Sequence, residues 1–456
     1  MFDLDSVRGR LAELLAEYRI PSAALGVLHE GRVTELAVGI KDVTTREPAT
    51  TDTIYQCGSM TKTWTTLAVM QLVDAGVVDL GAPVRTHLPE FTVADPNVAA
   101  AVTPRQLLNH TNGIEEAFGD PGADEDVYAR MVAAIADAPQ VFPLGHTHGY
   151  SAALGYAILG RILEVADGEP WHEIMRTRLF GPLGQADTSC RPEDVETARA
   201  ATGHVLRSLD EGPIVTPVDH LPRAFGPGGA VNSTVRDVLA LAQIFLDGGR
   251  GPDGTRIVSE AAVREMMNSR VPLPDPYMFG PEWALGLIVC DWHGETVYAT
   301  DGSTIGQNAR LRILPDRNLA VTLLTNGSPR EPFYKKVFEI ILSDLGAPNV
   351  PEPPRPDPAL RLDPARYVGT YARPDTHFEV TAADGNLSLT LFLNPMHAQF
   401  LGKPNRIVHR LLPLSETHFL LESDDPRDDP QTVALYDFQN GRARYLHTNS
   451  RVHPRA

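Results

Sequence analysis

Apolar residues recur at helix-like or strand-like spacing along most of this chain. Residues 3–19 carry apolar side chains on one helical face, which predicts an amphipathic helix. Residues 23–28 and 33–38 flank the turn His29-Glu30-Gly31-Arg32 and predict a hairpin. The pattern is mainly helical from 60 to 250, with one helix start predicted at Thr103-Pro104 and another helix at 235–246 after the cap Ser233/Thr234. Later residues predict further strands and a closing helix, at 284–290, 295–300, 309–314, 319–325 and 331–345.

Strands therefore lie at both ends of the first 346 residues, with helices between them. The economical arrangement is one antiparallel sheet built from both ends, with helices packed on it and a helical lobe inserted. The predicted fold class is α/β (α+β).

A proline-rich stretch separates this part from the rest of the chain. Seven prolines occur from Pro348 to Pro364, which predicts a stiff, extended linker. Beyond it, β-type runs flank turn sequences that include Asn440-Gly441, and such repeated hairpins predict a small antiparallel barrel. The predicted division is an α/β domain at 1–346, a linker at 347–364 and a β-domain at 365–456.

The composition limits the cellular compartment and the classes of binding partner to be expected. The chain has 456 residues and a formal net charge of −18, so it lacks the basic balance that nucleic acid or an anionic membrane surface requires. No run of 18 apolar residues predicts a membrane span, and the first ten residues lack the apolar core of a signal peptide. A cytoplasmic protein is therefore expected. Three scattered cysteines fit neither a disulfide framework nor a zinc site.

A serine and a lysine three residues apart are the sharpest candidates for chemistry. Ser59 and Lys62 follow a β-like run and open a predicted amphipathic helix, in a chain with only five lysines. Side chains at this spacing share one helix face, and a helix N-terminus supplies N–H groups where an oxyanion would form. Taken alone, the motif fits a helix-capping serine and a solvent-exposed lysine as well as it fits a reactive pair.

Two further segments change that balance. Tyr150 lies on a loop before an apolar helix at 152–165, where a tyrosine is well placed for acid–base work. Residues 300–303, Thr-Asp-Gly-Ser, end a predicted strand, and the glycine there lets backbone approach a ligand closely. In isolation, Tyr150 also fits a half-buried loop tyrosine without a catalytic role. Residues 300–303 also fit a plain strand end.

Together these segments resemble the serine β-lactamase and penicillin-binding-protein superfamily, and within it the class C-like esterases, D-amino-acid peptidases and transacylases. The resemblance covers residues 5–345. Residues 107–114, Leu-Leu-Asn-His-Thr-Asn-Gly-Ile, look like the family's LLxHTSGL segment, and residues 227–237 look like its GGLxSTxxDL segment. It implies a β-lactamase-like sheet flanked by helices. The C-terminal domain, with Tyr-Val-Gly-Thr-Tyr at 367–371, resembles the lipocalin-like domain that many such hydrolases carry.

The resemblance implies a role for each matching residue. Ser59 would be the nucleophile that forms an acyl-enzyme, and Lys62 would take its proton or hold it in an activating hydrogen bond. Tyr150 would pass a proton to the leaving group and later activate the acceptor. The backbone N–H groups of Ser59 and Ser303 would form the oxyanion hole.

Two positions depart from the family pattern. Ala152 stands where the family's Y-x-N motif has asparagine, and Thr300 stands where its K-T-G or H-x-G motif has a basic residue. Ala152, Thr300, Asp301 and Gly302 are nonetheless expected to border the substrate. The two losses disfavour β-lactamase or cell-wall transpeptidase activity, but they leave the nucleophile, the base and the oxyanion donors in place.

Three functions remain open. The first is a serine hydrolase acting on a small ester or a peptide-like amide, such as an esterase or a D-amino-acid-type peptidase. The second is a transacylase or peptide cyclase of a biosynthetic pathway, in which an amine or hydroxyl resolves the acyl-enzyme. The third is a catalytically weak binding protein on the same scaffold. No cofactor is expected, and no metal either, because His146 and His148 lack a third ligand nearby in sequence. The expected partner is a small-molecule or peptide-like acyl substrate, and a homo-oligomer stays open.

Overall fold

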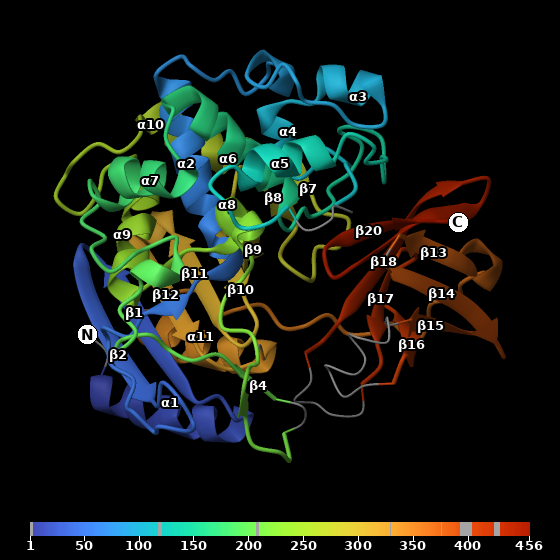
Figure 1. Cartoon of the computed structure of the whole chain (residues 1–456). Coiled ribbons are helices and arrows are strands. Elements are labelled where there is room, and N and C mark those ends of the chain that lie inside the picture. The colour runs from blue at the N-terminus through green and yellow to red at the C-terminus, as the bar shows by residue number, and fades with distance from the viewer. Residues whose placement is uncertain are drawn as a thin grey trace.

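The structure combines a large α/β unit with a β-barrel beside it (Figure 1). It is a computed structural model, which describes residues 3–116, 121–206, 209–328, 330–374, 376–392, 404–423 and 429–456. No helix within these ranges is long and apolar enough to cross a membrane. The predicted fold class, α/β (α+β) with a C-terminal barrel, is confirmed.

The central sheet has eight antiparallel strands drawn from both ends of the large unit. Their order is β2 (Arg32–Gly39), β1 (Ser22–His29), β12 (Leu319–Thr325), β11 (Asn308–Leu314), β10 (Glu295–Ser303), β9 (Ile288–Trp292), β8 (Glu282–Trp283) and β7 (Val271–Pro272). Ala23 of β1 lies opposite Thr325 of β12, so an early strand pairs with a late one. This confirms the predicted sheet built from both ends.

Helices lie on both faces of the sheet and form the inserted lobe. One face carries α1 (Leu4–Tyr18) and α11 (Glu331–Asp344). The other face and the lobe comprise α2 (Thr61–Asp74), α3 (Pro96–Ala101), α4 (Pro104–Leu108), α5 (Val127–Ala134), α6 (Leu154–Asp167), α7 (Trp171–Met175), α8 (Gly226–Gly229), α9 (Val235–Leu246) and α10 (Glu260–Asn268) (Figure 1).

Alternate residues of β1 enter two different hydrophobic cores. Ala23, Leu25 and Val27 pack with α1 and α11, whereas Ala24 and Leu28 pack with the helices of the opposite face. Successive side chains of a strand point to opposite faces of a sheet. A strand that lies between two helical layers is therefore apolar at nearly every position, as β1 is.

Local hydrogen bonds fix the starts of two helices at the predicted places. Thr103 caps α4 in a reciprocal capping box with Gln106. Thr234 caps α9 by accepting the N–H of Asp237. Both threonines stand one residue before the predicted helical run, so the sequence signal and the observed boundary agree.

One predicted strand is wrong in its first half. The run at 284–290 is interrupted, because β8 ends at Trp283 and β9 begins at Ile288. Gly286 between them has φ +71°, a left-handed conformation that turns the chain. Its carbonyl oxygen accepts the hydroxyl proton of Thr63 on α2 at 2.8 Å, which fixes the turn against the helix.

Among its described residues, the C-terminal sheet also has eight antiparallel strands. They run in chain order as β13 (Gly369–Arg373), β14 (Thr376–Ala383), β15 (Asn386–Phe392), β16 (Arg406–Pro413), β17 (His418–Leu421), β18 (Thr432–Gln439), β19 (Arg442–Thr448) and β20 (Arg451–Pro454). Tyr371 bridges Arg455, and Ala456 donates its N–H to the Thr370 carbonyl at 2.9 Å. The last strand thus meets the first, and the predicted small barrel is confirmed.

The connection between α11 and the barrel has no helix or strand at 347–363, a segment the structure describes in full. We propose the division into a catalytic domain, a linker and a barrel domain at the boundaries predicted from the prolines.

Candidate active site

Ser59 lies where a short strand turns into a buried helix. β3 (Tyr55–Gln56), paired with β6 (Asn232–Ser233), leads through a 3-10 turn at Gly58–Met60 into α2. Gly58 has φ +52°. A Cβ there would lie 2.7 Å from the backbone nitrogen of Ser303, so this turn requires glycine.

Lys62 lies on the first turn of α2, and its residue is 2% exposed. Its Nζ lies 3.3 Å from Ser59 Oγ and donates to the carbonyl oxygens of Ala152 and Gly228, each at 2.8 Å. Two carbonyls thus take two of its protons, and its remaining position faces the serine hydroxyl. In a neutral amine that position would be a lone pair directed at the hydroxyl.

Tyr150 lies next to Lys62, on the loop before α6. Its ring centroid is 4.9 Å from Lys62 Nζ. The ring packs against His110 at 4.6 Å and Trp283 at 5.7 Å between centroids. These contacts restrict how the tyrosine can turn. The structure therefore brings the three residues predicted for catalysis together.

His110 is a neutral neighbour of this cluster. Burial lowers the pKa of the imidazole well below 6.5, and the nearby charge of Lys62 acts in the same direction. Nδ1 of His110 accepts the N–H of Ser151 at 3.1 Å, so the neutral ring carries its proton on Nε2. Lys62 consequently has an uncharged ring beside it, and the loop that follows Tyr150 is tied to that ring.

The backbone N–H groups of Ser59 and Ser303 come close because glycines allow two segments to touch. A Cβ on Gly302 would lie 1.8 Å from the Cys57 carbonyl oxygen and 2.8 Å from the Ser59 nitrogen. The Ser303 side chain donates to Asn308 Oδ1 at 2.6 Å, so its contribution to the site is its backbone. Two N–H groups beside a nucleophile are the arrangement that stabilises an acyl-transfer oxyanion.

The residues predicted to border the substrate divide between the two faces of β10. Thr300 lies toward α2, with its hydroxyl 2.9 Å from that of Thr63. Asp301 points to the other face, where its carboxylate accepts from Arg312 at 3.1 Å and lies 3.6 Å from Arg310. The structure therefore places Asp301 in a buried ion-pair cluster and does not bring it to Ser59. The alternation of side chains along a strand is the reason.

Ala152 enters the site through its backbone. Its carbonyl oxygen accepts from Lys62 Nζ at 2.8 Å. A Cβ on Gly228 would lie 2.7 Å from this same oxygen, so glycine in the 227–237 segment makes room for the contact. A main-chain oxygen thus contacts the lysine at the position where the family has an asparagine side chain.

Glu116 is a site residue that the sequence pattern did not indicate. Its carboxylate accepts the hydroxyl of Ser151 at 2.8 Å. It also accepts the backbone N–H groups of Ala152, Ala153 and Leu154, at 3.1, 3.0 and 3.0 Å. These groups open α6, so Glu116 caps the helix that follows the catalytic loop. A glutamate so far from the helix in sequence carries no recognisable capping signal.

Replacing Gly302 with alanine is expected to lower kcat/KM by about 10²- to 10³-fold, the usual cost of losing an oxyanion donor. The new methyl would overlap the Cys57 carbonyl and push the Ser303 N–H away from Ser59. Steady-state kinetics with an activated ester, together with the thermal unfolding midpoint, checks this expectation.

Gly9→Ala is the matched control, because a Cβ on Gly9 in α1 would meet nothing within 4 Å. It is expected to leave activity unchanged and to raise stability by up to about 1 kcal/mol. If Gly302→Ala kept the wild-type kcat/KM, the close approach of residues 57–59 to residues 302–303 would not serve catalysis.

Comparison with known proteins identifies the family. The family model described as Beta-lactamase matches residues 7–345. The chain belongs to the Beta-lactamase family. It is therefore a serine hydrolase of the β-lactamase fold, and the matched range contains Ser59, Lys62, Tyr150 and Ser303.

Relatives of this Beta-lactamase-family protein cover from 75% to 99% of the chain. "Penicillin-binding protein 4" of Amycolatopsis lactamdurans is 40% identical over 379 residues, which is 82% of this chain and 98% of that protein. The crystal structure of SurE with D-Leu is similar with a TM-score of 0.77 at 29% identity, over 99% of both chains. A D-amino acid amidase structure from Ochrobactrum anthropi SV3 shares the fold, with a TM-score of 0.64 at 22% identity over 75% of this chain and 98% of that one.

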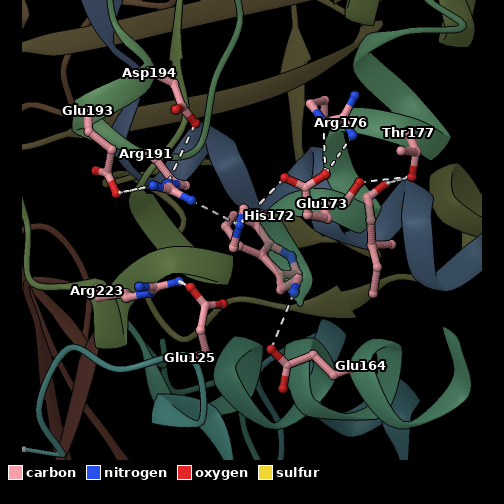
Figure 2. Close-up of polar contacts among 12 residues, drawn as sticks. Glu125, Glu164, His172, Glu173, Arg176, Thr177, Arg191, Glu193, Asp194 and Arg223 are labelled. Atoms are coloured by element: carbon pink, nitrogen blue, oxygen red, sulfur yellow. Dashed lines mark hydrogen bonds and ion pairs between the residues drawn. The ribbon is translucent and has the colours of Figure 1, made fainter. Parts of the chain in front are cut away.

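A separate hollow of about 820 Å³ lies along residues 172–199, and the three predicted catalytic residues do not line it. Figure 2 shows the charged side chains around it pairing with one another. Arg176 pairs with Glu173 at 2.6 Å, and Arg191 with Glu193 at 2.6 Å. Burial lowers the pKa of His172 between them. Among the described residues, no group of three or more His, Cys, Asp or Glu is placed to hold a metal ion.

Proposed function

We propose that this Beta-lactamase-family protein forms an acyl-enzyme on Ser59 and acts on a small ester or a peptide-like amide. The observation that carries the proposal is the position of Lys62. Its amine is buried and held by two carbonyl oxygens, and its third position faces Ser59 Oγ at 3.3 Å. A buried lysine held in this way supports general-base activation of the serine.

The proposed reaction has two halves. In the first, Ser59 Oγ attacks the carbonyl carbon and its proton moves to Lys62 Nζ. The negative oxygen accepts the N–H groups of Ser59 and Ser303, and the leaving alcohol or amine takes a proton through Tyr150. In the second, an acceptor loses its proton to the same groups and attacks the ester carbonyl, and Ser59 regains its hydroxyl.

Side chains beside Tyr150 support an acyl group with an apolar side chain. Phe279 lies 6.1 Å from the Tyr150 ring between centroids. Tyr277 and Met278, just before it, are 45% and 42% exposed. Thr300 offers a neutral hydroxyl, which supports substrates that do not depend on a terminal carboxylate. We therefore place esters and amides of apolar amino acids first among the substrates.

Acyl transfer to an amine is the second candidate. The SurE structure that contains D-Leu matches this chain over both units and 99% of its length. A free amino acid can serve as an acyl acceptor through its amine, and this likeness supports testing D-leucine in that role. A transacylase would use the same acyl-enzyme and differ only in what resolves it.

An acyl-donor screen tests the proposal. Activated esters of D- and L-leucine, phenylalanine and glycine are expected to shift the intact mass by one acyl group, on Ser59, with the apolar D-donors reacting fastest. Added D-leucine should divert product from acid to amide if the protein is a transacylase. Product that stays entirely acid at high D-leucine concentration supports the hydrolase.

A protein that forms no adduct with any donor would contradict both catalytic proposals. That result would favour the third function, a binding protein on this scaffold. Adducts on a residue other than Ser59 would contradict the assignment of the nucleophile.

A further inference from the structure

The barrel contacts the loop that carries the catalytic tyrosine. The Ser450 carbonyl oxygen, in the turn between β19 and β20, accepts the N–H of Tyr150 at 2.9 Å. Asn449 and Ser450 have φ values of +47° and +59°. Left-handed backbone is unfavourable at residues other than glycine and persists where the surroundings hold it. A two-residue hairpin turn requires positive φ at both of its residues, so the pairing of Thr448 with Arg451 accounts for this conformation. The hairpin itself thus presents the Ser450 carbonyl to the tyrosine loop.

The next barrel residue reaches the carboxylate that organises the other end of the same loop. Nη1 of Arg451 lies 3.1 Å from Oε2 of Glu116, with the two side chains 34% and 11% exposed. Burial alone would raise the pKa of Glu116, but Arg451 and the three backbone N–H groups outweigh it and lower the pKa from its ordinary value. Glu116 is consequently a carboxylate when the barrel is in place.

An adjacent pair anchors the barrel at the same point. Arg373 of β13 donates to both carboxylate oxygens of Glu115, and its Nε lies 3.0 Å from Oε2. Both side chains are less than 10% exposed. Two consecutive glutamates of the catalytic domain are thus each held by an arginine of the barrel, which limits how far the barrel can move from the tyrosine loop.

We propose that Glu116 and Arg451 are positioning residues for Tyr150, and that the barrel is through them a working part of the active site. This rests on the proposed function of the same site. Glu116 accepts the N–H of Ala152, whose carbonyl oxygen holds Lys62 Nζ. One carboxylate, oriented by the barrel, therefore fixes both the backbone after the tyrosine and a ligand of the lysine.

Two single variants test the pair. In Glu116→Gln the amide keeps one acceptor oxygen but loses the ion pair, and in Arg451→Met the carboxylate stays without its partner. Each is expected to lower kcat by about 10- to 100-fold with KM within about threefold of wild type, because a small displacement of a catalytic group reduces turnover. Ser59 should still label stoichiometrically with a fluorophosphonate. The double variant should be no slower than the slower single variant, as for residues acting as one unit.

Asp437→Asn is the matched control. Asp437 of β18 accepts from His146 Nε2 at 2.9 Å, so it also joins the barrel to the catalytic domain, yet it contacts no residue of the 150–154 segment. Wild-type kcat in this variant, with reduced kcat in the Glu116 and Arg451 variants, supports the proposal. An equal loss in all three would show a general interface effect and overturn it.

Other outcomes separate this proposal from the proposed function. A wild-type kcat in Arg451→Met, where the arginine side chain is 34% exposed, overturns the positioning role. So does a rise in KM at constant kcat, since that indicates direct substrate contact. A loss of activity that follows a fall in the unfolding midpoint indicates a structural role instead. If wild-type protein forms no acyl adduct, the proposed function itself fails.

Discussion

Replacing Ser59 with alanine is expected to abolish fluorophosphonate labelling and to lower turnover by at least about 10³-fold. The residual rate would come from the oxyanion donors and from substrate binding, which survive when a nucleophile is removed. Active-site labelling followed by intact-protein mass spectrometry, and kcat with the best acyl donor, measure both effects. Lys62 Nζ keeps its two carbonyl partners in this variant, so the fold around the site should persist.

Ser343→Ala provides the comparison. Ser343 is an exposed serine on α11 whose hydroxyl donates to Asn349 Oδ1 at 3.1 Å. This variant should label and turn over like wild type. Labelling that survives in Ser59→Ala would mean that another residue is the nucleophile.

Lys62→Arg is expected to lower kcat by about 10³-fold or more while Ser59 remains in place. Arginine keeps the positive charge but cannot give up a proton near neutral pH, so it can stabilise charge without acting as a base. Its planar guanidinium also fits poorly between the Ala152 and Gly228 carbonyls, where a Cβ on Gly228 would already lie 3.3 Å from Nζ. The measurement is the pre-steady-state rate of acylation.

Lys336→Arg is the matched variant on the surface of α11. Lys336 pairs with Glu17 of α1 at 2.8 Å, and arginine can replace it in that role. It should acylate at the wild-type rate. If Lys62→Arg retained more than a tenth of the wild-type rate, the positive charge of the side chain would account for the contribution of Lys62 to acylation, and proton transfer would not.

The proximity of Ser59 and Lys62 could be predicted because their relation is local. Ser59 and Lys62 lie three residues apart on one helix, so sequence spacing alone places them together. The helix starts at Thr103 and Thr234 were predictable for the same reason, since a cap and the N–H group it accepts lie within one turn. The sheet built from both ends followed from the order of strands and helices along the chain.

Register and turn geometry account for the errors. Asp301 was expected near the substrate, although it is the immediate neighbour of Thr300 on a strand and so faces the opposite side of the sheet. The strand predicted at 284–290 looked continuous because its apolar residues are unbroken. One left-handed glycine, Gly286, is enough to turn it, and the apolar pattern carries no information about that.

Long-range contacts explain what the sequence could not indicate. Glu116 reaches the start of α6 across 35 to 38 residues, and Ser450 reaches Tyr150 from another domain. No spacing rule links such residues. His110 stood within a recognised segment, yet its neutral state depends on complete burial and on Lys62, which only the folded chain provides.

The pairing of β1 with β12 also determines when the central sheet can form during synthesis of the chain. About 290 residues separate His29 from Leu319, so at 5–20 residues per second the early hairpin waits roughly 15–60 s on the ribosome for its neighbouring strand. Throughout that interval β1 has an open edge and uncovered apolar faces, the features that invite wrong pairing. Ser59 emerges early, Ser303 late and Ser450 later still. Synthesis of this enzyme should therefore depend on chaperones that shield the nascent hairpin, and its catalytic site should be the last feature of the large unit to mature.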